Sequence, residues 1–286
     1  MGLILFLNEA FSWFNGNMKI GVFDSGLGGL FTMSAIVKKL PEYDYVYLGD
    51  TKRLPYGSRS QEMIYEFLKE GVDFLFSKNC ALIIVACNTA SAEALRKLQQ
   101  EYLPKKYPIH EIDKKVLGMI VPIVEECAQY KSVGLIGTSA TIASGAYQKE
   151  FIKRNHTTKV IGLPTPLLVP IIENNEKELL MPTIQKYLTY FKNKKIEALI
   201  LGCTHYAIIK KEVASLMPKN IKIISQNDII PNKTKEYLKR HPEIETILSK
   251  NKSQEFFVTD TTQAFQKTAK KWFGEEVNLI EIAIEK

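Results

Sequence analysis

Two cysteines lie in short stretches whose composition suits proton transfer or nucleophilic chemistry. Cys87 belongs to residues 85–91 (Val-Ala-Cys-Asn-Thr-Ala-Ser), and Cys203 belongs to residues 201–206 (Leu-Gly-Cys-Thr-His-Tyr). Each follows an apolar run, 81–85 or 198–201, that is typical of a buried strand. Each thiol is therefore expected at the carboxyl end of a strand, where open α/β sheets bind ligands. The repeated arrangement indicates two similar halves that face each other.

A thiol on each side of a small molecule would suit proton transfer at carbon. One base removes a proton from one face of a stereocentre and the other delivers a proton to the opposite face. One sulfur must then be thiolate while the other is thiol. Because an unperturbed cysteine pKa is about 8.5, each thiol needs a neighbour that tunes it. The candidates are Asp24 near Cys87, and Glu173 or His205 near Cys203.

Three other uses of the cysteines remain open at this point. A thiolate zinc site usually draws four ligands at short spacing, and His205 alone lies that near to Cys203. A thiol hydrolase could pair these two residues, but side chains two positions apart at a strand end are expected to point in different directions. Both cysteines could also be ordinary buried residues. The matched pair of Thr-rich turns favours the two-base interpretation, which needs no metal and no cofactor.

The predicted elements alternate between strands and helices. A strand at 19–23 leads into a Gly-rich loop, residues 24–29 (Asp-Ser-Gly-Leu-Gly-Gly), and a helix over 30–40. This loop is not a dinucleotide fingerprint, because the third glycine would fall on Phe31. Further strands are predicted at 45–48, 81–85, 115–120, 132–136, 159–163, 198–201, 221–225 and 255–259. The pattern predicts an α/β protein with parallel sheets.

The connections set the expected order of the halves. Residues 101–115 are predicted to form a loop that leads into the second half. The late strand at 255–259 and a helix over 262–272 are expected to return to the first half, because the chain must close the edge of that sheet.

Composition narrows the class of protein. The chain has 286 residues, of which 45% are hydrophobic, and a formal net charge of +7, so a large core is expected. The basic residues are scattered, without the long basic run and interleaved aromatics that track nucleic acid. Cys80 and Cys127 are predicted core thiols, and a reduced, cytoplasmic compartment is expected. Residues 1–17 lack the features of a signal peptide or a membrane span and are interpreted as an extension before Met18.

Six motifs resemble those of the glutamate racemases in order and spacing. The resemblance runs from Met18 to roughly Leu216. It implies a cofactor-independent enzyme that interconverts L- and D-glutamate and supplies D-glutamate for peptidoglycan, and hence for cell wall biogenesis and cell shape. The motifs occupy residues 24–29, 49–51, 55–57, 86–91, 137–141 and 202–206.

The same resemblance implies roles for individual residues. Cys203 would deprotonate L-glutamate and Cys87 would deprotonate D-glutamate. Asp24 would assist Cys87, while Glu173 and His205 would assist Cys203. No metal or cofactor is implied. The substrate would be bound by Asp24, Ser25, Pro55, Tyr56, Gly57, Asn88, Thr89, Thr138, Thr141 and Thr204.

The resemblance further implies two pseudo-symmetric α/β domains with mainly parallel sheets, flanking helices and the active site in the cleft between them. We expect a first domain over 18–113 and 224–286, and a second over 114–223. A glutamate substrate and a homodimer are expected, with no membrane association and no nucleic acid or gyrase contact as the main function. A racemase for aspartate or another amino acid is the alternative.

The sequence departs from the family pattern at three places. Ala207 stands where the family usually has Pro, and residues 225–228 (Ser-Gln-Asn-Asp) stand where it usually has Asp-Ser. The segment 101–115 is longer than usual. None of these departures removes a proposed catalytic residue, but the third could alter the dimer contact.

Overall fold

Two sheets of parallel strands form the framework of the protein. The computed structural model describes residues 16–108, 114–154, 156–274 and 276–284, so most of the extension predicted at 1–17 lies outside it. A six-stranded sheet has the order β10-β9-β2-β1-β3-β4 and a four-stranded sheet the order β6-β5-β7-β8. The predicted α/β class is confirmed. The strands are β1 (Lys19–Asp24), β2 (Tyr45–Gly49), β3 (Cys80–Val85), β4 (Lys115–Gly118), β5 (Ser132–Gly137), β6 (Lys159–Pro164), β7 (Ala198–Gly202), β8 (Lys222–Ser225), β9 (Gln254–Val258) and β10 (Leu279–Glu281).

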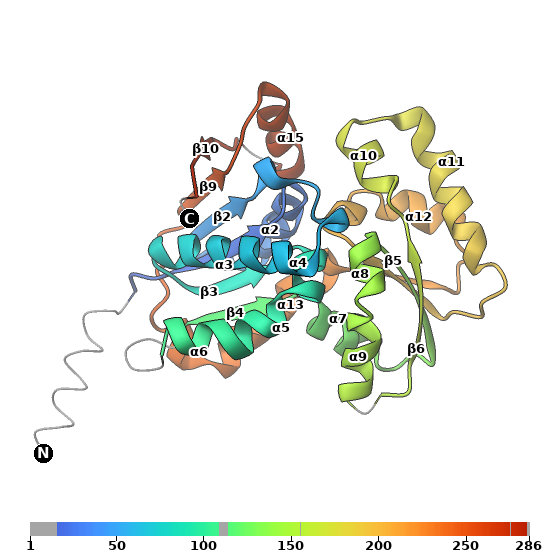
Figure 1. Cartoon of the computed structure of the whole chain (residues 1–286), viewed down its shortest axis with the longest axis horizontal. Coiled ribbons are helices and arrows are strands. Elements are labelled where there is room, and N and C mark those ends of the chain that lie inside the picture. Colours follow the sequence, from blue (N-terminus) through green and yellow to red (C-terminus); the bar gives the residue numbers. More distant parts are fainter. Residues whose placement is uncertain (1–15, 109–113, 155, 275, 285–286) are drawn as a thin grey trace, which may run out of the picture.

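Helices connect the strands and cover the sheets (Figure 1). The α-helices are α2 (Gly28–Lys39), α3 (Gln61–Ser77), α4 (Asn88–Glu93), α5 (Leu95–Lys97), α6 (Leu103–Lys106), α7 (Ile120–Cys127), α8 (Ser139–Ala143), α9 (Ala146–Lys153), α10 (Leu168–Glu173), α11 (Lys177–Leu188), α12 (Lys210–Leu216), α13 (Gln226–Arg240), α14 (Pro242–Glu245) and α15 (Gln263–Phe273). Short helical turns include η1 (Thr51–Arg53), η2 (Tyr56–Ser58) and η5 (Thr204–Ala207).

The central strands of the first sheet are buried on both faces. Along β1, Ile20 and Val22 pack into the core on the side of α2, whereas Phe23 packs into a second core with residues of α3. This alternation follows from the two-residue period of a strand. Because helices cover both faces, the central strands are apolar throughout, as is typical of parallel sheets. Residue Asp24, at the end of β1, is thereby held at the carboxyl edge of the sheet.

A single hydrophobic cluster joins the two halves. It contains residues of β1 and α2 from the first half together with residues of β5 and β7 from the second. Helix α13 contributes Ile229 and Ile230, and α7 contributes Ile123 and Val124. Figure 1 shows α13 at the junction between the halves, where it contacts α2, α7 and β8. The carboxyl edges of both sheets are held together by this shared core.

Strand β4 differs from its predicted place. It pairs with β3 in the six-stranded sheet, with Leu82 opposite Lys115, although 115–120 was expected to open the second half. Sheet membership depends on which strand edge is free, and local sequence does not encode that. The predicted domain boundaries at 113/114 and 223/224 stay predictions, and the second of them falls within β8.

Other connections can be compared with their predictions. Strand β9 pairs with β2, so the predicted return of the late strand to the first half is confirmed. Residues 103–106 form α6, where a loop was predicted. Strand β10 was not predicted, because it is short and two of its three residues are exposed.

Two further features concern the state of the cysteines and the character of the helices. All four cysteines are free and buried, and Cys80 and Cys127 are core thiols as predicted. Within the described ranges, none of the helices combines the length and the apolar character that crossing a membrane requires.

Candidate active site

Asp24 ends β1 and is completely buried. The backbone N–H groups of Gly26 and Gly29 donate to its Oδ2 at 3.1 and 3.0 Å. The Gly-rich loop therefore turns back to hold one carboxylate oxygen. The other oxygen, Oδ1, is buried without a hydrogen-bond partner in the structure. Buried polar atoms of this kind are uncommon and call for an explanation.

Cys87 follows β3 and is the N-cap residue of α4. Its sulfur accepts from the backbone N–H of Ala90 at 3.4 Å and its thiol donates to Ser25 Oγ at 3.4 Å. Burial, followed by the charge of Asp24, raises the pKa of Cys87 to about 12, although its hydrogen bonds with Ser25 and Ala90 act in the opposite direction. The thiol is therefore protonated at neutral pH. Asp24 was expected to assist Cys87, and its negative charge favours the protonated form of that thiol.

Cys203 follows β7 and begins a chain of polar contacts. Its Sγ lies 3.7 Å from His205 Nδ1, and His205 Nε2 lies 2.9 Å from Glu173 Oε1. The expectation that Cys203 and His205 point in different directions is wrong. The tight turn of η5 places the imidazole back against the sulfur. Glu173, at the end of α10, reaches Cys203 through the imidazole rather than directly.

The imidazole is held in its charged form. Burial lowers the pKa of His205, but the hydrogen bonds to Cys203 and Glu173 outweigh that effect and raise it to about 10. A protonated His205 donates from both nitrogens, toward the sulfur on one side and the carboxylate on the other. Its charge also opposes the burial effect that raises the pKa of Asp24. The two halves are therefore electrostatically coupled at this point.

The ends of the two sheets are in close contact. A Cβ atom on Gly28 would lie 2.5 Å from Thr204 Oγ1 and 2.7 Å from His205 Nδ1, so only glycine fits there. A Cβ on Gly57 would lie 2.8 Å from Thr138 Cβ. Cys87 and Cys203 are 5% and 7% exposed, and the charge of Cys203 contributes to the raised pKa of Cys87. The thiols therefore lie at one closed junction.

Three threonines meet across the same junction. Thr89 Oγ1 of α4 lies 2.9 Å from Thr138 Oγ1 and 3.3 Å from Thr141 Oγ1. The last two hydroxyls lie 2.9 Å apart. Thr138 is the N-cap residue of α8 and Thr141 lies within that helix. The cluster joins a helix of the first half to a helix of the second.

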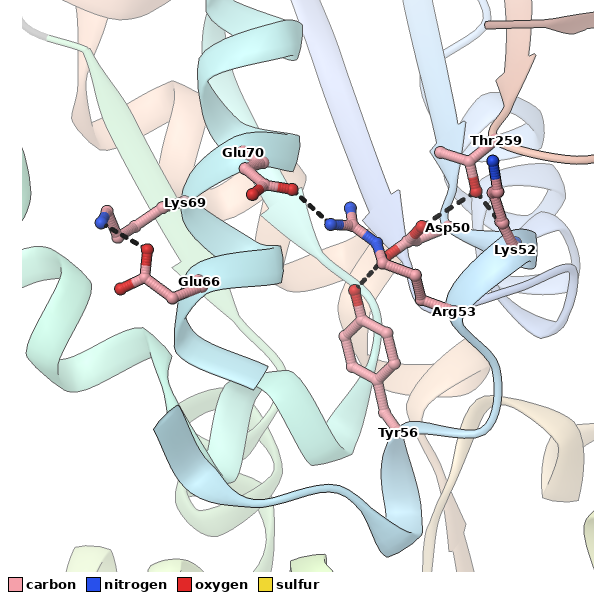
Figure 2. Close-up of polar contacts among 8 residues, drawn as sticks. All are labelled: Asp50, Lys52, Arg53, Tyr56, Glu66, Lys69, Glu70 and Thr259. Atoms are coloured by element: carbon pink, nitrogen blue, oxygen red, sulfur yellow. Dashed lines mark hydrogen bonds and ion pairs between the residues drawn. The ribbon is translucent and has the colours of Figure 1, made fainter. Parts of the chain in front are cut away.

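The loop at 55–57 is fixed by a polar network (Figure 2). The Tyr56 hydroxyl donates to Asp50 Oδ2, and Arg53 Nε donates to the same oxygen at 2.6 Å. Thr259 Oγ1 donates to Asp50 Oδ1 at 2.9 Å, and Arg53 also pairs with Glu70. Because the hydroxyl of Tyr56 is already hydrogen-bonded to Asp50, Tyr56 would contact a ligand through its backbone groups.

Comparison with known proteins places these residues in a family. Residues 29–232 match the Asp/Glu/hydantoin racemase family model. The chain is 40% identical over 265 residues to a glutamate racemase of Aquifex aeolicus, covering 91% of this chain and 96% of that protein.

This chain belongs to the Asp/Glu/hydantoin racemase family.

Solved structures of that family have the same fold. A glutamate racemase of Francisella tularensis in complex with D-glutamate superposes with a TM-score of 0.83 at 33% identity, covering 94% of this chain and 98% of that chain. A glutamate racemase isoform of Bacillus anthracis gives a TM-score of 0.83 at 30% identity, covering 93% and 97%. The predicted family is confirmed.

The structure brings together most of the residues that the sequence singled out, and it adds others. Trp272 of α15 makes an edge contact with His205, with ring centroids 5.5 Å apart. Tyr147 and Gln226 both hydrogen-bond to Asn88. No local signal marked Trp272 or Tyr147, whereas Gln226 lies in one of the departures from the family pattern. Within the described residues, no group of three or more acidic, His or Cys side chains could hold a metal ion.

The coupling of Glu173 to His205 makes a testable prediction. In Glu173→Gln the pKa of His205 should fall from about 10 toward its ordinary value of about 6.5, because a neutral amide replaces the carboxylate. NMR titration of the four histidines would measure this. Glu176→Gln, in an exposed acid nearby, is the matched control.

The sign of the stability effect follows from the same shift. A histidine whose pKa is raised on folding stabilises the fold fully below its unfolded pKa, and this contribution is lost as pH rises through the folded value. The difference in unfolding free energy between the native protein and Glu173→Gln should therefore shrink as pH rises toward about 10. An unchanged His205 titration in Glu173→Gln would contradict the coupling.

Proposed function

We propose that this protein interconverts L- and D-glutamate by a two-base mechanism that uses Cys203 and Cys87. The observation that carries the proposal is the meeting of two thiols, one from each sheet, with different polar partners. Cys203 has an imidazole beside it and Cys87 has a carboxylate near it. The glutamate racemase relatives support glutamate as substrate. A two-base transfer requires no cofactor.

In the L-to-D direction Cys203 would act as the base. As a thiolate, it would accept a hydrogen bond from His205 Nδ1 and remove the Cα proton of L-glutamate. The Cys87 thiol, with its pKa raised to about 12, delivers its proton to the opposite face. D-glutamate leaves with Cys203 as thiol and Cys87 as thiolate. Proton exchange with solvent then restores the starting state.

In the D-to-L direction Cys87 must first lose its proton. The carboxylate of Asp24 opposes that loss, and its Oδ1 has no partner in the structure. The ammonium group of glutamate would satisfy this oxygen and neutralise its charge. Binding of the substrate would then lower the pKa of Cys87, because the repulsion between carboxylate and thiolate disappears. Asp24 thus has both a binding and a tuning role.

Hydroxyl and backbone groups at the junction would bind the two carboxylates of the substrate. Thr89, Thr138 and Thr141 supply hydroxyls from both halves, and Thr204 lies beside His205. Ser25, Asn88 and the loop of Pro55, Tyr56 and Gly57 complete the proposed binding set. These groups are neutral, so they would bind the carboxylates without adding a positive charge beside that of His205.

The biological setting follows from the family resemblance. D-glutamate made in the cytoplasm would supply peptidoglycan synthesis, and the enzyme would act as a homodimer. Static light scattering would measure the molar mass in solution and so test the dimer.

Proton NMR with L-glutamate in D2O, without added cofactor, tests the proposal. The Cα proton signal should disappear while the circular dichroism of the amino acid decays to zero. Aspartate serves as a comparison substrate, because a racemase for aspartate is the alternative. Glutamine serves as a second one, because the contacts from Cys203 through His205 to Glu173 would also suit a thiol hydrolase. Ammonia release from glutamine without any Cα exchange on glutamate would overturn the proposal in favour of hydrolysis.

Replacement of each thiol should separate the two half-reactions. Cys87→Ser and Cys203→Ser should each lower racemisation by about 10²-fold or more, since each enantiomer needs its own base. Cys87→Ser should still exchange the Cα proton of L-glutamate, and Cys203→Ser that of D-glutamate. Cys80→Ser, in a buried thiol at the opposite end of β3 from Cys87, is the control. Full turnover by either catalytic variant would exclude the two-base mechanism.

Replacement of the buried carboxylate should affect mainly the chemical step. Asp24→Asn should lower kcat for D-glutamate by more than it raises KM, because the ammonium group, and with it the Cα proton, would no longer be held in line with the Cys87 sulfur. Asp44→Asn is the matched control, since Asp44 is a buried aspartate that binds Asn251 and the N–H of Ser253. Steady-state kinetics in both directions would measure the effect, and an unchanged kcat would remove Asp24 from the mechanism.

A further inference from the structure

A chain of buried hydrogen bonds crosses the junction beside Cys87. The Tyr147 hydroxyl donates to Asn88 Oδ1 at 2.8 Å, and Asn88 Nδ2 donates to Gln226 Oε1 at 2.5 Å. Gln226 Nε2 then donates to Thr32 Oγ1 at 2.6 Å. Thr32 donates to Asn227 Oδ1 at 3.0 Å, and Asn227 Nδ2 donates to a backbone carbonyl of α2 at 3.0 Å.

Every bond in this chain runs in the same direction. Each side chain accepts from one neighbour and donates to the next, so no donor faces a donor. Aligned bonds of this kind polarise and strengthen one another in a low-dielectric interior. Tyr147, Asn88, Gln226 and Thr32 are each at most 2% exposed, so water does not replace a lost partner. The chain therefore specifies one arrangement of α9, α4, α13 and α2.

Gln226 is the member of the chain whose two hydrogen bonds no other side chain of equal length could form. Its position requires an acceptor toward Asn88 and a donor toward Thr32 at the end of one side chain. A glutamine amide offers both groups. A carboxylate of equal length lacks the donor, and an apolar side chain lacks both. Gln226 also lies in residues 225–228, where the sequence departs from the family pattern.

Asn88 directly follows Cys87 and is the first residue of α4. Its amide is held from the second half by Tyr147 and from α13 by Gln226. The start of α4 sets the direction of the Cys87 sulfur, which accepts from Ala90 of the same helix.

We infer that Gln226 is a positioning residue, which fixes the Cys87 thiol for proton transfer by holding the side chain of Asn88. This inference rests on the proposed role of Cys87. Gln226 does not touch the thiol, so its effect passes through Asn88. Its removal would leave Asn88 Nδ2 without its acceptor, so that Tyr147 alone would hold the amide of Asn88 at the start of α4.

Kinetics on three variants test the inference. Gln226→Leu should lower kcat by roughly tenfold to a hundredfold with a smaller change in KM, because small displacements of a catalytic group cost much of the rate. Gln226→Glu keeps the acceptor for Asn88 and should retain more activity than Gln226→Leu. Thr234→Val is the control, since Thr234 is buried in the same helix and its hydroxyl donates to the backbone carbonyl of Ile230.

Isotope effects distinguish positioning from a general loss of stability. Proton removal by Cys87 becomes slower in Gln226→Leu, so the deuterium effect on D-glutamate labelled at Cα should rise relative to that on labelled L-glutamate. A structural defect would lower the amount of active enzyme and leave both effects unchanged. Equal isotope effects in Gln226→Leu and the native protein, or an unchanged kcat, would overturn the inference.

A second measurement does not depend on racemase activity. Iodoacetamide labelling followed by mass spectrometry should show Cys87 reacting several-fold faster in Gln226→Leu than in the native protein, with Cys203 unchanged. If the native protein fails to racemise glutamate but this difference appears, the proposed function fails and the positioning of Cys87 stands. Equal labelling of Cys87 in both proteins would overturn the positioning itself.

Discussion

The burial of several ionisable groups at one junction is the constraint on which the rest of the structure depends. Asp24, Cys87, Cys203 and His205 are each at most 7% exposed. Charges in such a place are stabilised by one another and by fixed dipoles, since water is largely excluded. The protonated imidazole offsets the carboxylates of Asp24 and Glu173, and the Gly-rich loop supplies N–H groups to Asp24. Neither half alone provides this balance, so the site exists only where the halves meet.

The two sheets reach this junction because small residues permit close approach. Gly28 opens α2 directly against Thr204 and His205, and Gly57 lies against Thr138. A methyl group at either glycine would push apart residues of the two halves that are in contact. The hydrophobic cluster that both halves share, with residues of α2, α7 and α13, holds the halves together. The packing therefore sets the distance between the halves, and that distance allows polar groups of the two halves to form hydrogen bonds.

Local sequence pattern was sufficient to predict where the two cysteines lie in the fold, whereas contacts between residues far apart in the chain could not be predicted from it. An apolar run followed by a polar turn identifies a strand end from sequence, so both cysteines were placed correctly after β3 and β7. The sheet that β4 joins, the engagement of the Tyr56 hydroxyl by Asp50, and the contact of Trp272 with His205 depend on residues far away in the chain. The orientation of His205 was missed because the geometry of η5, and not residue spacing, decides it.

The threonine cluster would favour a carboxylate over a neutral ligand at this junction. Thr89, Thr138 and Thr141 satisfy one another's hydroxyls across the two halves, so an entering ligand must replace those bonds. A neutral ligand would exchange hydroxyl bonds for others of similar strength and gain little. A carboxylate accepts shorter, charge-assisted bonds that are roughly twice as strong, and it can take donors from α4 and α8 at once. The hydroxyls that now bond to one another across the two halves would then bond to the substrate carboxylate, with the thiols on either side.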